Sequence, residues 1–331
     1  MKPVNRIPRG AARARQAGVS LIELMIALVL GLLVVGAAIG VFISNKATYR
    51  STQNLARIQE SAQVAFELLS RDIREAGANP CDATLAPANI TTAAATATPD
   101  GADWYLAVDY PLYGFEDGGP THVSGTDVIQ ILRPGDDLRG LTADLASGAT
   151  SVTVAPATPL FKSGDPVMIC DMRVLAVFRA NGDSTAGGSL SFASGAGTNS
   201  CDYFPMPNTG TCAGAATAYA FPKFSSVISL QGVRWFLRDP DGNPDNGYSL
   251  YRQVNGAAAE EVVQGVANLQ FHYLTDAGYV SASVLTTAAD WRNVRAVRMT
   301  LVLRETERTG TGGQHLTRVV ENVVALRNRV L

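Results

Sequence analysis

The sequence has few of the residues on which enzyme active sites usually depend. Its 331 residues include only three histidines, His122, His272 and His315, and their spacing does not resemble that of metal ligands. There is no Gly-x-Ser-x-Gly elbow, no phosphate-binding Walker loop and no His-Glu-x-x-His motif. The sequence therefore favours a protein that is not an enzyme and needs no cofactor.

Clusters of Lys and Arg are missing beyond residue 18. The whole chain has 27 basic and 29 acidic side chains, and residues 1–18 hold five of the basic ones and no acid. The rest of the chain carries 22 basic and 29 acidic side chains, a net charge of −7. Because phosphate contacts require grouped Lys and Arg, we expect no nucleic-acid partner.

An apolar run from Val19 to Ile43 follows the basic leader, and Glu23 is its only charged residue. As an α-helix with a rise of about 1.5 Å per residue, this run would be roughly 38 Å long, more than the hydrocarbon core of about 30 Å. The positive-inside rule keeps a basic leader in the cytoplasm. The sequence therefore predicts one transmembrane helix, residues 19–43, in the inner membrane, with the following residues in the periplasm.

The position of Gly18 before the apolar run bears on the type of signal sequence. An ordinary secretory signal is cleaved after its apolar core, but here Gly18 precedes that core. A carboxylate in lipid costs roughly 2–3 kcal/mol on insertion scales, so Glu23 requires a specific reason. The segment Gly18-Val19-Ser20-Leu21-Ile22-Glu23 resembles the type IV prepilin signal.

That resemblance implies that prepilin peptidase cleaves between Gly18 and Val19 and methylates the new amino terminus of Val19. Residues 1–18 would then be a prepilin leader. The resemblance also implies that Glu23 meets the terminal amine of a neighbouring subunit during assembly, which would compensate both buried charges. Val19 stands where Phe or Met is commoner in the family. The alternatives are an uncleaved single-pass anchor and a conventional signal peptide.

The chain turns polar from Ser44 and meets no proline before Pro80. Its apolar residues then recur at spacings of three and four, which marks one helical face: Leu55, Ile58, Ala62, Ala65, Phe66, Leu69 and Ile73. We therefore expect a single helix from Val19 to Ala76, with residues 44–77 as its amphipathic continuation and Gly77 near its end. Gly36 and Gly40 form a small-xxx-small pair that could seat another helix.

Beyond residue 77 the sequence is β-rich, with runs of β-branched and aromatic residues between turn signals. Residues 83–102 and 180–216 have the composition of surface loops. The expected fold class is α+β: a long N-terminal helix carries a C-terminal antiparallel β-rich globular head, residues 78–331, as in a pilin-like lollipop. The expected strands are Asp127–Leu132, Ser151–Val154, Pro166–Phe178, Ser226–Leu237, Tyr248–Gln253, Val266–Leu274, Val294–Arg304 and His315–Val330.

Later segments resemble the successive motifs of PilW-type minor pilins, namely Phe66–Gly77, Tyr248–Arg252, Gly265–Gln270, Trp291–Arg298 and Val324–Arg329. The resemblance implies a low-abundance subunit that joins the major pilin and other minor pilins, with a possible tip adhesin. Such a subunit helps to prime pilus assembly and ends in the filament, near its tip. One alternative is a J-type pseudopilin of type II secretion, and another is a minor pilin that binds DNA or a surface ligand.

Two further residue sets could form sites in the head. Four cysteines allow three disulfide connectivities, and the simplest joins Cys201 to Cys212, leaving Cys81 to pair with Cys170. Asp239, Asp241, Asn243 and Asp245 alternate as the early ligands of a calcium loop do. However, Pro244 and Leu250 replace the glycine and glutamate that such a loop requires, so we favour a hairpin turn and no metal.

Overall fold

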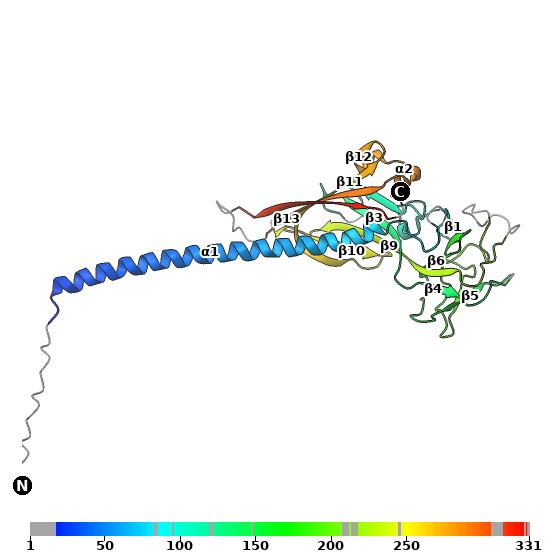
Figure 1. Cartoon of the computed structure of the whole chain (residues 1–331), viewed down its shortest axis with the longest axis horizontal. Helices are drawn as coiled ribbons and strands as arrows, with labels where there is room; N and C mark the ends of the chain where they lie inside the picture. Colours follow the sequence, from blue (N-terminus) through cyan, green and yellow to red (C-terminus); the bar gives the residue numbers. More distant parts are fainter. Residues whose placement is uncertain are drawn as a thin grey trace, which may run out of the picture. The chain divides into compact units, whose positions relative to one another are not determined.

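The computed structural model describes residues 18–331 except 83–84, 95, 120–121, 147, 207–211, 213–217, 244–245, 306–313, 328 and 330–331. Contacts divide the chain into two compact units, and their boundary, between Gln53 and Asn54, falls inside the first helix. That helix is α1 (Leu21–Arg74), 54 residues long (Figure 1). Most of the preceding leader lies outside the described residues.

Helix α1 begins two residues later and ends two residues earlier than the expected Val19–Ala76. At its start, the Oγ of Ser20 accepts a hydrogen bond from the backbone N–H of Glu23 at 3.2 Å, so Ser20 caps the helix. At its end, Gly77 adopts a positive φ of 69° and its N–H donates to the carbonyl of Leu132 at 2.8 Å. The Ser20 cap sets the start of the helix, and the left-handed backbone of Gly77, held by strand residue Leu132, follows its end.

The second unit contains a sheet of 14 strands, with short helices between some of them. After α1, the helices that the structure describes in full are η1 (Trp104–Leu106), η4 (Ala282–Val284) and α2 (Ala288–Arg292). The strands are β1 (Pro87–Asn89), β2 (Leu112–Phe115), β3 (Val128–Pro134), β4 (Arg139–Leu141), β5 (Ser151–Ala155), β6 (Pro166–Cys170), β7 (Leu175–Arg179), β8 (Ser189–Ser191), β9 (Ser226–Arg238), β10 (Tyr248–Val254), β11 (Glu260–Thr275), β12 (Gly278–Val280), β13 (Ala296–Arg304) and β14 (Thr317–Ala325).

The strands pair almost entirely in antiparallel fashion, and the main path runs β1-β7-β6-β9-β10-β11-β13-β14. The exception is β1, which pairs with β7 in parallel. Strand β9 belongs to two parts of the sheet: its first residues pair with β4 and β6, and its later residues lie between β3 and β10. The predicted α+β class, a long N-terminal helix followed by an antiparallel β-rich head, is confirmed.

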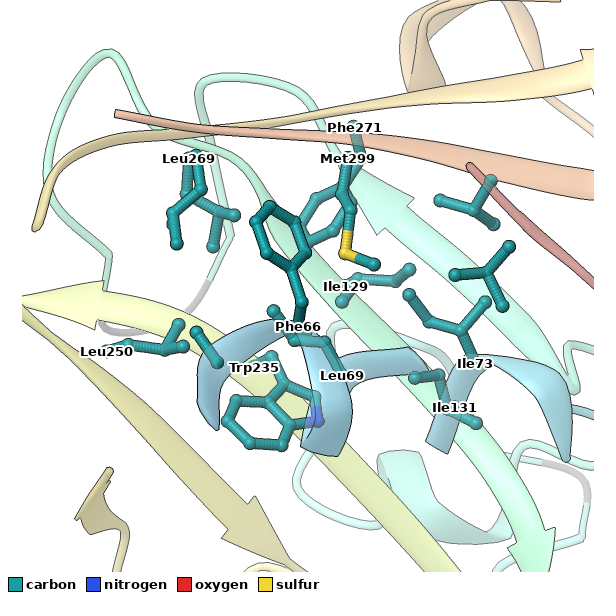
Figure 2. Close-up of a cluster of buried hydrophobic side chains, with 14 of the residues drawn as sticks. Phe66, Leu69, Ile73, Ile129, Ile131, Trp235, Leu250, Leu269, Phe271 and Met299 are labelled. Carbon is teal, nitrogen blue, oxygen red and sulfur yellow. The ribbon is translucent and has the colours of Figure 1, made fainter. Parts of the chain in front are cut away.

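The C-terminal part of α1 supplies one side of the main hydrophobic core (Figure 2). Phe66, Leu69 and Ile73 project from the helix toward Ile129 and Ile131 of β3, and toward Trp235 of β9. Strands β10, β11 and β13 complete this core with Leu250, Leu269, Phe271 and Met299. The apolar residues of α1 that recur every three or four positions from Ile58 to Ile73 are thus the ones that the structure buries.

A second core lies around strands β4–β8, and it corrects the expectation of surface loops. Phe192 and Phe204 are fully buried with ring centroids 4.5 Å apart, although both lie in the Gly- and Ser-rich stretch 180–216. Ala88 and Ile90, from the Ala- and Thr-rich stretch 83–102, are also buried in this core. The small residues of these stretches have the composition of loops, but a few large apolar side chains among them are buried in the second core.

Candidate assembly site

The expected cleavage site lies just before α1. Gly18, Val19 and Ser20 have no helical or strand conformation, and all three residues are exposed. The peptide bond between Gly18 and Val19 is therefore outside the hydrogen-bonded helix. Exposed irregular backbone of this kind is accessible to a peptidase, whereas helical backbone is not.

Glu23 lies in the first turn of α1, three residues after the capping Ser20. Its side chain is exposed, and its neighbours Leu21, Ile22, Leu24 and Met25 are 56–77% exposed. The carboxylate thus lies beside the positive end of the helix dipole and within an apolar surface. This is the arrangement in which a cation from another molecule could reach it.

The apolar surface around Glu23 continues along the helix to Ile43. Every large apolar side chain from Leu21 to Ile43 is more than half exposed, and the segment is long and apolar enough to cross a membrane. No heavy atom within 4 Å would obstruct a Cβ on Gly36 or Gly40, so both glycines lie on open surface. An apolar surface of this extent requires lipid or other helices to cover it.

A buried ionic cluster fixes the other end of α1 to the head. Asp72 is 3% exposed, and its carboxylate accepts hydrogen bonds from Trp235 Nε1 at 2.9 Å and Arg252 Nε at 3.0 Å. The Nε of Arg133 lies 3.1 Å from the other carboxylate oxygen, and its Nη1 lies 2.8 Å from Glu75. One acid of the helix therefore contacts side chains from β3, β9 and β10, which fixes the register of the helix on the sheet.

The pattern of the sequence did not predict this junction between α1 and the sheet. The available signal was Asp72 itself, a charged residue within the apolar stripe of Leu69, Ile73 and Ala76. A buried carboxylate requires a cation or several donors, so an acid in that position predicts partners elsewhere in the head. The sequence alone does not identify those partners, because they lie 58–180 positions from the helix residues they contact.

The four cysteines form the simplest of the expected pairings. Cys81 is bonded to Cys170, which ties the segment after α1 to the end of β6. Cys201 is bonded to Cys212, which closes a short loop beside the second core. Disulfides persist in oxidising compartments, of which the bacterial periplasm is one.

The weak calcium candidate lies in the turn between β9 and β10. Asp239 Oδ1 accepts hydrogen bonds from the N–H groups of Asp241 and Gly242, and Asp241 accepts from the amide side chain of Asn246. The bond from Asn246 is the main cause that lowers the pKa of the Asp241 carboxyl. Asn243 donates its backbone N–H to Asp241, and Asp245 lies outside the described residues. These contacts are those of successive Asx turns.

Comparison with protein families gives two matches to the chain. The prokaryotic N-terminal methylation motif matches residues 13–39, which include Gly18, Val19 and Glu23. The model of type IV pilus-assembly protein W matches residues 242–323, from the turn before β10 into β14. The chain is similar to PilW-like type IV pilins. A search of curated proteins found no significant match.

The two family matches fall on different parts of the structure. The methylation motif covers the exposed apolar start of α1, and the PilW match covers strands that pack against its buried end. Together they support a type IV pilus minor pilin, and pilin-family segments point to a structural, non-enzymatic subunit. The prepilin-like motif and the apolar helix also suggest a membrane-anchored protein.

Proposed function

We propose that this PilW-like pilin is processed by prepilin peptidase between Gly18 and Val19 and primes pilus assembly within a minor-pilin complex. After cleavage, Val19 is the methylated amino terminus and Glu23 receives the amine of a neighbouring subunit. The apolar surface from Leu21 to Ile43 is first covered by the inner membrane, as a single span with a periplasmic head. Other minor pilins and the major pilin replace the lipid when the subunit enters the filament, near its tip.

The observation that carries this proposal is the exposed apolar start of α1, which coincides with the methylation motif. A plain membrane anchor explains the apolar surface but gives no role to Glu23, whose burial in lipid would cost roughly 2–3 kcal/mol. In the proposed filament, the terminal amine of a neighbour compensates that carboxylate. The PilW match supports the minor-pilin assignment within the wider family.

The decisive experiment compares a deletion strain with the same strain complemented by the wild-type chain. Sheared surface pili and the activity of type II secreted enzymes are measured in each strain. We expect pili to be lost and restored while secretion stays normal. Lost secretion with normal pili would instead assign the chain to the J-type pseudopilins, and normal pili with normal secretion would contradict both assignments.

Processing is tested separately on the complemented strain. Intact-mass and N-terminal peptide analysis of the purified protein should find a chain that begins at methylated Val19. A chain that retains residues 1–18 would contradict the cleavage step, whatever the effect of the deletion on pili.

A further inference from the structure

A cavity in the head lies between residues 77–79, just after α1, and strands β3, β6 and β7. Its volume is about 280 Å³. From β3, β6 and β7 it is lined by apolar side chains that are at most 5% exposed, namely Leu132, Met168, Leu175 and Val177. Val108 and Pro111 line it from the segment before β2. A cavity of this size is at the small end of ligand pockets and suits a short apolar group.

Two arginines, Arg292 and Arg329, give the apolar cavity a cationic side. Arg292 pairs with the exposed Asp109 at 2.6 Å. Arg329 is partly buried, and its Nη1 donates to the carbonyls of Trp291 and Val294 at 2.6 and 3.2 Å. Among the residues that the structure describes, no Asp or Glu forms an ion pair with Arg329. Within the described part of the chain, the hydrogen bonds of Arg329 go to backbone carbonyls, which carry only partial charge.

The second guanidinium nitrogen of Arg329 lies on the side of Gly77. A Cβ built on Gly77 would lie 3.5 Å from Nη2 and 3.1 Å from Pro111, so the absence of a side chain there keeps the space next to Nη2 open. Burial, together with the nearby Arg292 cation, lowers the pKa of Arg329 to about 10. Two neighbouring cations without a buried acid between them are electrostatically unfavourable, and an anion would relieve this.

We propose that this cavity binds a carboxylate attached to a short apolar group, as found at the C-terminal residue of a partner polypeptide. The apolar side chain enters the space between Leu132, Met168 and Val177. The carboxylate accepts a hydrogen bond from Arg329 and lies near Arg292. Because Nη1 already donates to the carbonyls of Trp291 and Val294, Nη2 is the nitrogen that would meet the carboxylate, through one charge-assisted hydrogen bond.

The test measures binding of a fluorescein-labelled peptide ending in Val-Leu to the full-length protein in nonionic detergent, by fluorescence polarisation. The same peptide with a C-terminal amide is the first control, and hexanoate is a competitor without a polypeptide chain. We expect the acid form to bind at least about tenfold more tightly than the amide form, because a charge-assisted hydrogen bond is lost in the amide. Equal binding of acid and amide, or no binding of either ligand, would overturn the proposal.

Hexanoate distinguishes the two sources of this ligand chemistry. Displacement of the peptide by hexanoate supports recognition of a carboxylate with an apolar group. Binding of hexanoate without binding of the peptide would keep the site but overturn the polypeptide as its source. The binding assay does not depend on pilus assembly, so its result and that of the deletion experiment can be told apart.

Variants separate binding from folding. Arg329→Gln should weaken binding about tenfold or more, while Arg329→Lys, which keeps the cation, should stay within about threefold of wild type. Arg295→Gln removes an exposed arginine paired with Asp276 and should leave binding unchanged. Equal loss in the Gln and Lys variants at position 329 would mean that Arg329 only supports the fold, and would overturn its role in binding.

A second pair of variants tests the apolar part without touching an arginine. Val108→Phe adds a ring to a residue that lines the cavity and should reduce binding about tenfold. Val284→Phe is the matched control, because Val284 is 60% exposed and does not line the cavity. Unchanged binding in Val108→Phe would contradict occupation of this cavity.

Discussion

Two acidic side chains of the same helix have opposite surroundings. Glu23, in the first turn of α1, is exposed among exposed apolar side chains, whereas Asp72, in the last turn, is 3% exposed and contacts Arg133, Arg252 and Trp235. The apolar side chains follow the same division, because those before Gln53 are exposed and those facing the sheet are buried. The contrast shows that one helix can serve two purposes. Its C-terminal part is buried against the head of the same chain, and its N-terminal part exposes an apolar surface that lipid or other subunits must cover.

A large effect on stability is expected from breaking the buried end of α1. Asp72→Ala should lower the free energy of unfolding by about 3 kcal/mol, because it removes the acid that Arg133 and Arg252 share and leaves the buried Trp235 Nε1 without its acceptor. The measurement is urea denaturation of the full chain in detergent, followed by tryptophan fluorescence. Asp276→Ala is the control, since it breaks an exposed pair with Arg295 that should contribute only about 0–1 kcal/mol. Equal effects of the two substitutions would contradict a structural role for the Asp72 cluster.

A matched pair of leucines compares the two halves directly. Leu69→Ala should destabilise the head by about 2–5 kcal/mol, because Leu69 is fully buried between α1 and the sheet. Leu28→Ala makes the same chemical change at a side chain that is 59% exposed and should leave the urea midpoint unchanged. If Leu28→Ala were as destabilising as Leu69→Ala, the start of α1 would have to contribute to the fold of the head.

A third acid, Asp127, is buried with backbone N–H groups as its hydrogen-bond donors. Its carboxyl is 4% exposed, and burial raises its pKa although the N–H groups of Phe271 and Asp117 donate to it. Because the folded state holds this proton more tightly than the unfolded state, the group stabilises the fold below the unfolded pKa of about 3.9. That contribution is lost as pH rises through the folded pKa. Wild type should therefore lose stability relative to Asp127→Asn between pH 4 and pH 7.

Asp241 supplies the control of opposite sign for this pH experiment. Its folded pKa is lowered, with the bond from Asn246 as the main cause, so its contribution is present above the unfolded pKa and is lost as pH falls through the folded pKa. The stability of wild type should therefore increase relative to that of Asp241→Asn as pH rises. Urea denaturation of all three proteins at both pH values measures the difference, and the same sign for both variants would refute the account of Asp127.

The smallest effect on stability, with the largest effect on assembly, is expected at Glu23. Glu23→Ala should leave both the urea midpoint and cleavage after Gly18 unchanged, because the side chain is exposed in the isolated chain. Incorporation into sheared pili should fall strongly. Glu67→Ala, at an exposed position of the same helix, is the control and should be incorporated normally. Normal incorporation of Glu23→Ala would remove the proposed pairing with a terminal amine.

The features predicted well from the sequence are those that depend on neighbouring residues. Strand β9 was expected at Ser226–Leu237 and is found at Ser226–Arg238, because a run of β-branched and aromatic residues ends at a turn. The single strand expected at Pro166–Phe178 is wrong. It is two strands, because Asp171 Oδ1 accepts hydrogen bonds from the N–H groups of Arg173 and Val174 and reverses the chain.

Features that depend on contacts between distant residues could not be predicted from the sequence. Strand β11 starts six residues before the expected Val266, because Gly265, with a positive φ of 74°, forms an irregularity within the strand and does not end it. Phe192 and Phe204 meet only after folding, and the partners of Asp72 come from three strands. Nothing in the local pattern specifies such contacts, which also explains why the Asp72 cluster and the arginine-lined cavity went unpredicted.

Strand β9 has a consequence for how the head comes apart. Its backbone pairs with β4 and β6 at one end and with β3 and β10 at the other, so the main core and the second core share one continuous strand. The cores cannot separate by bending at a loop, because separation would break hydrogen bonds along a single strand. Mechanical load applied to one core therefore passes directly to the other, and the head should yield as one cooperative block.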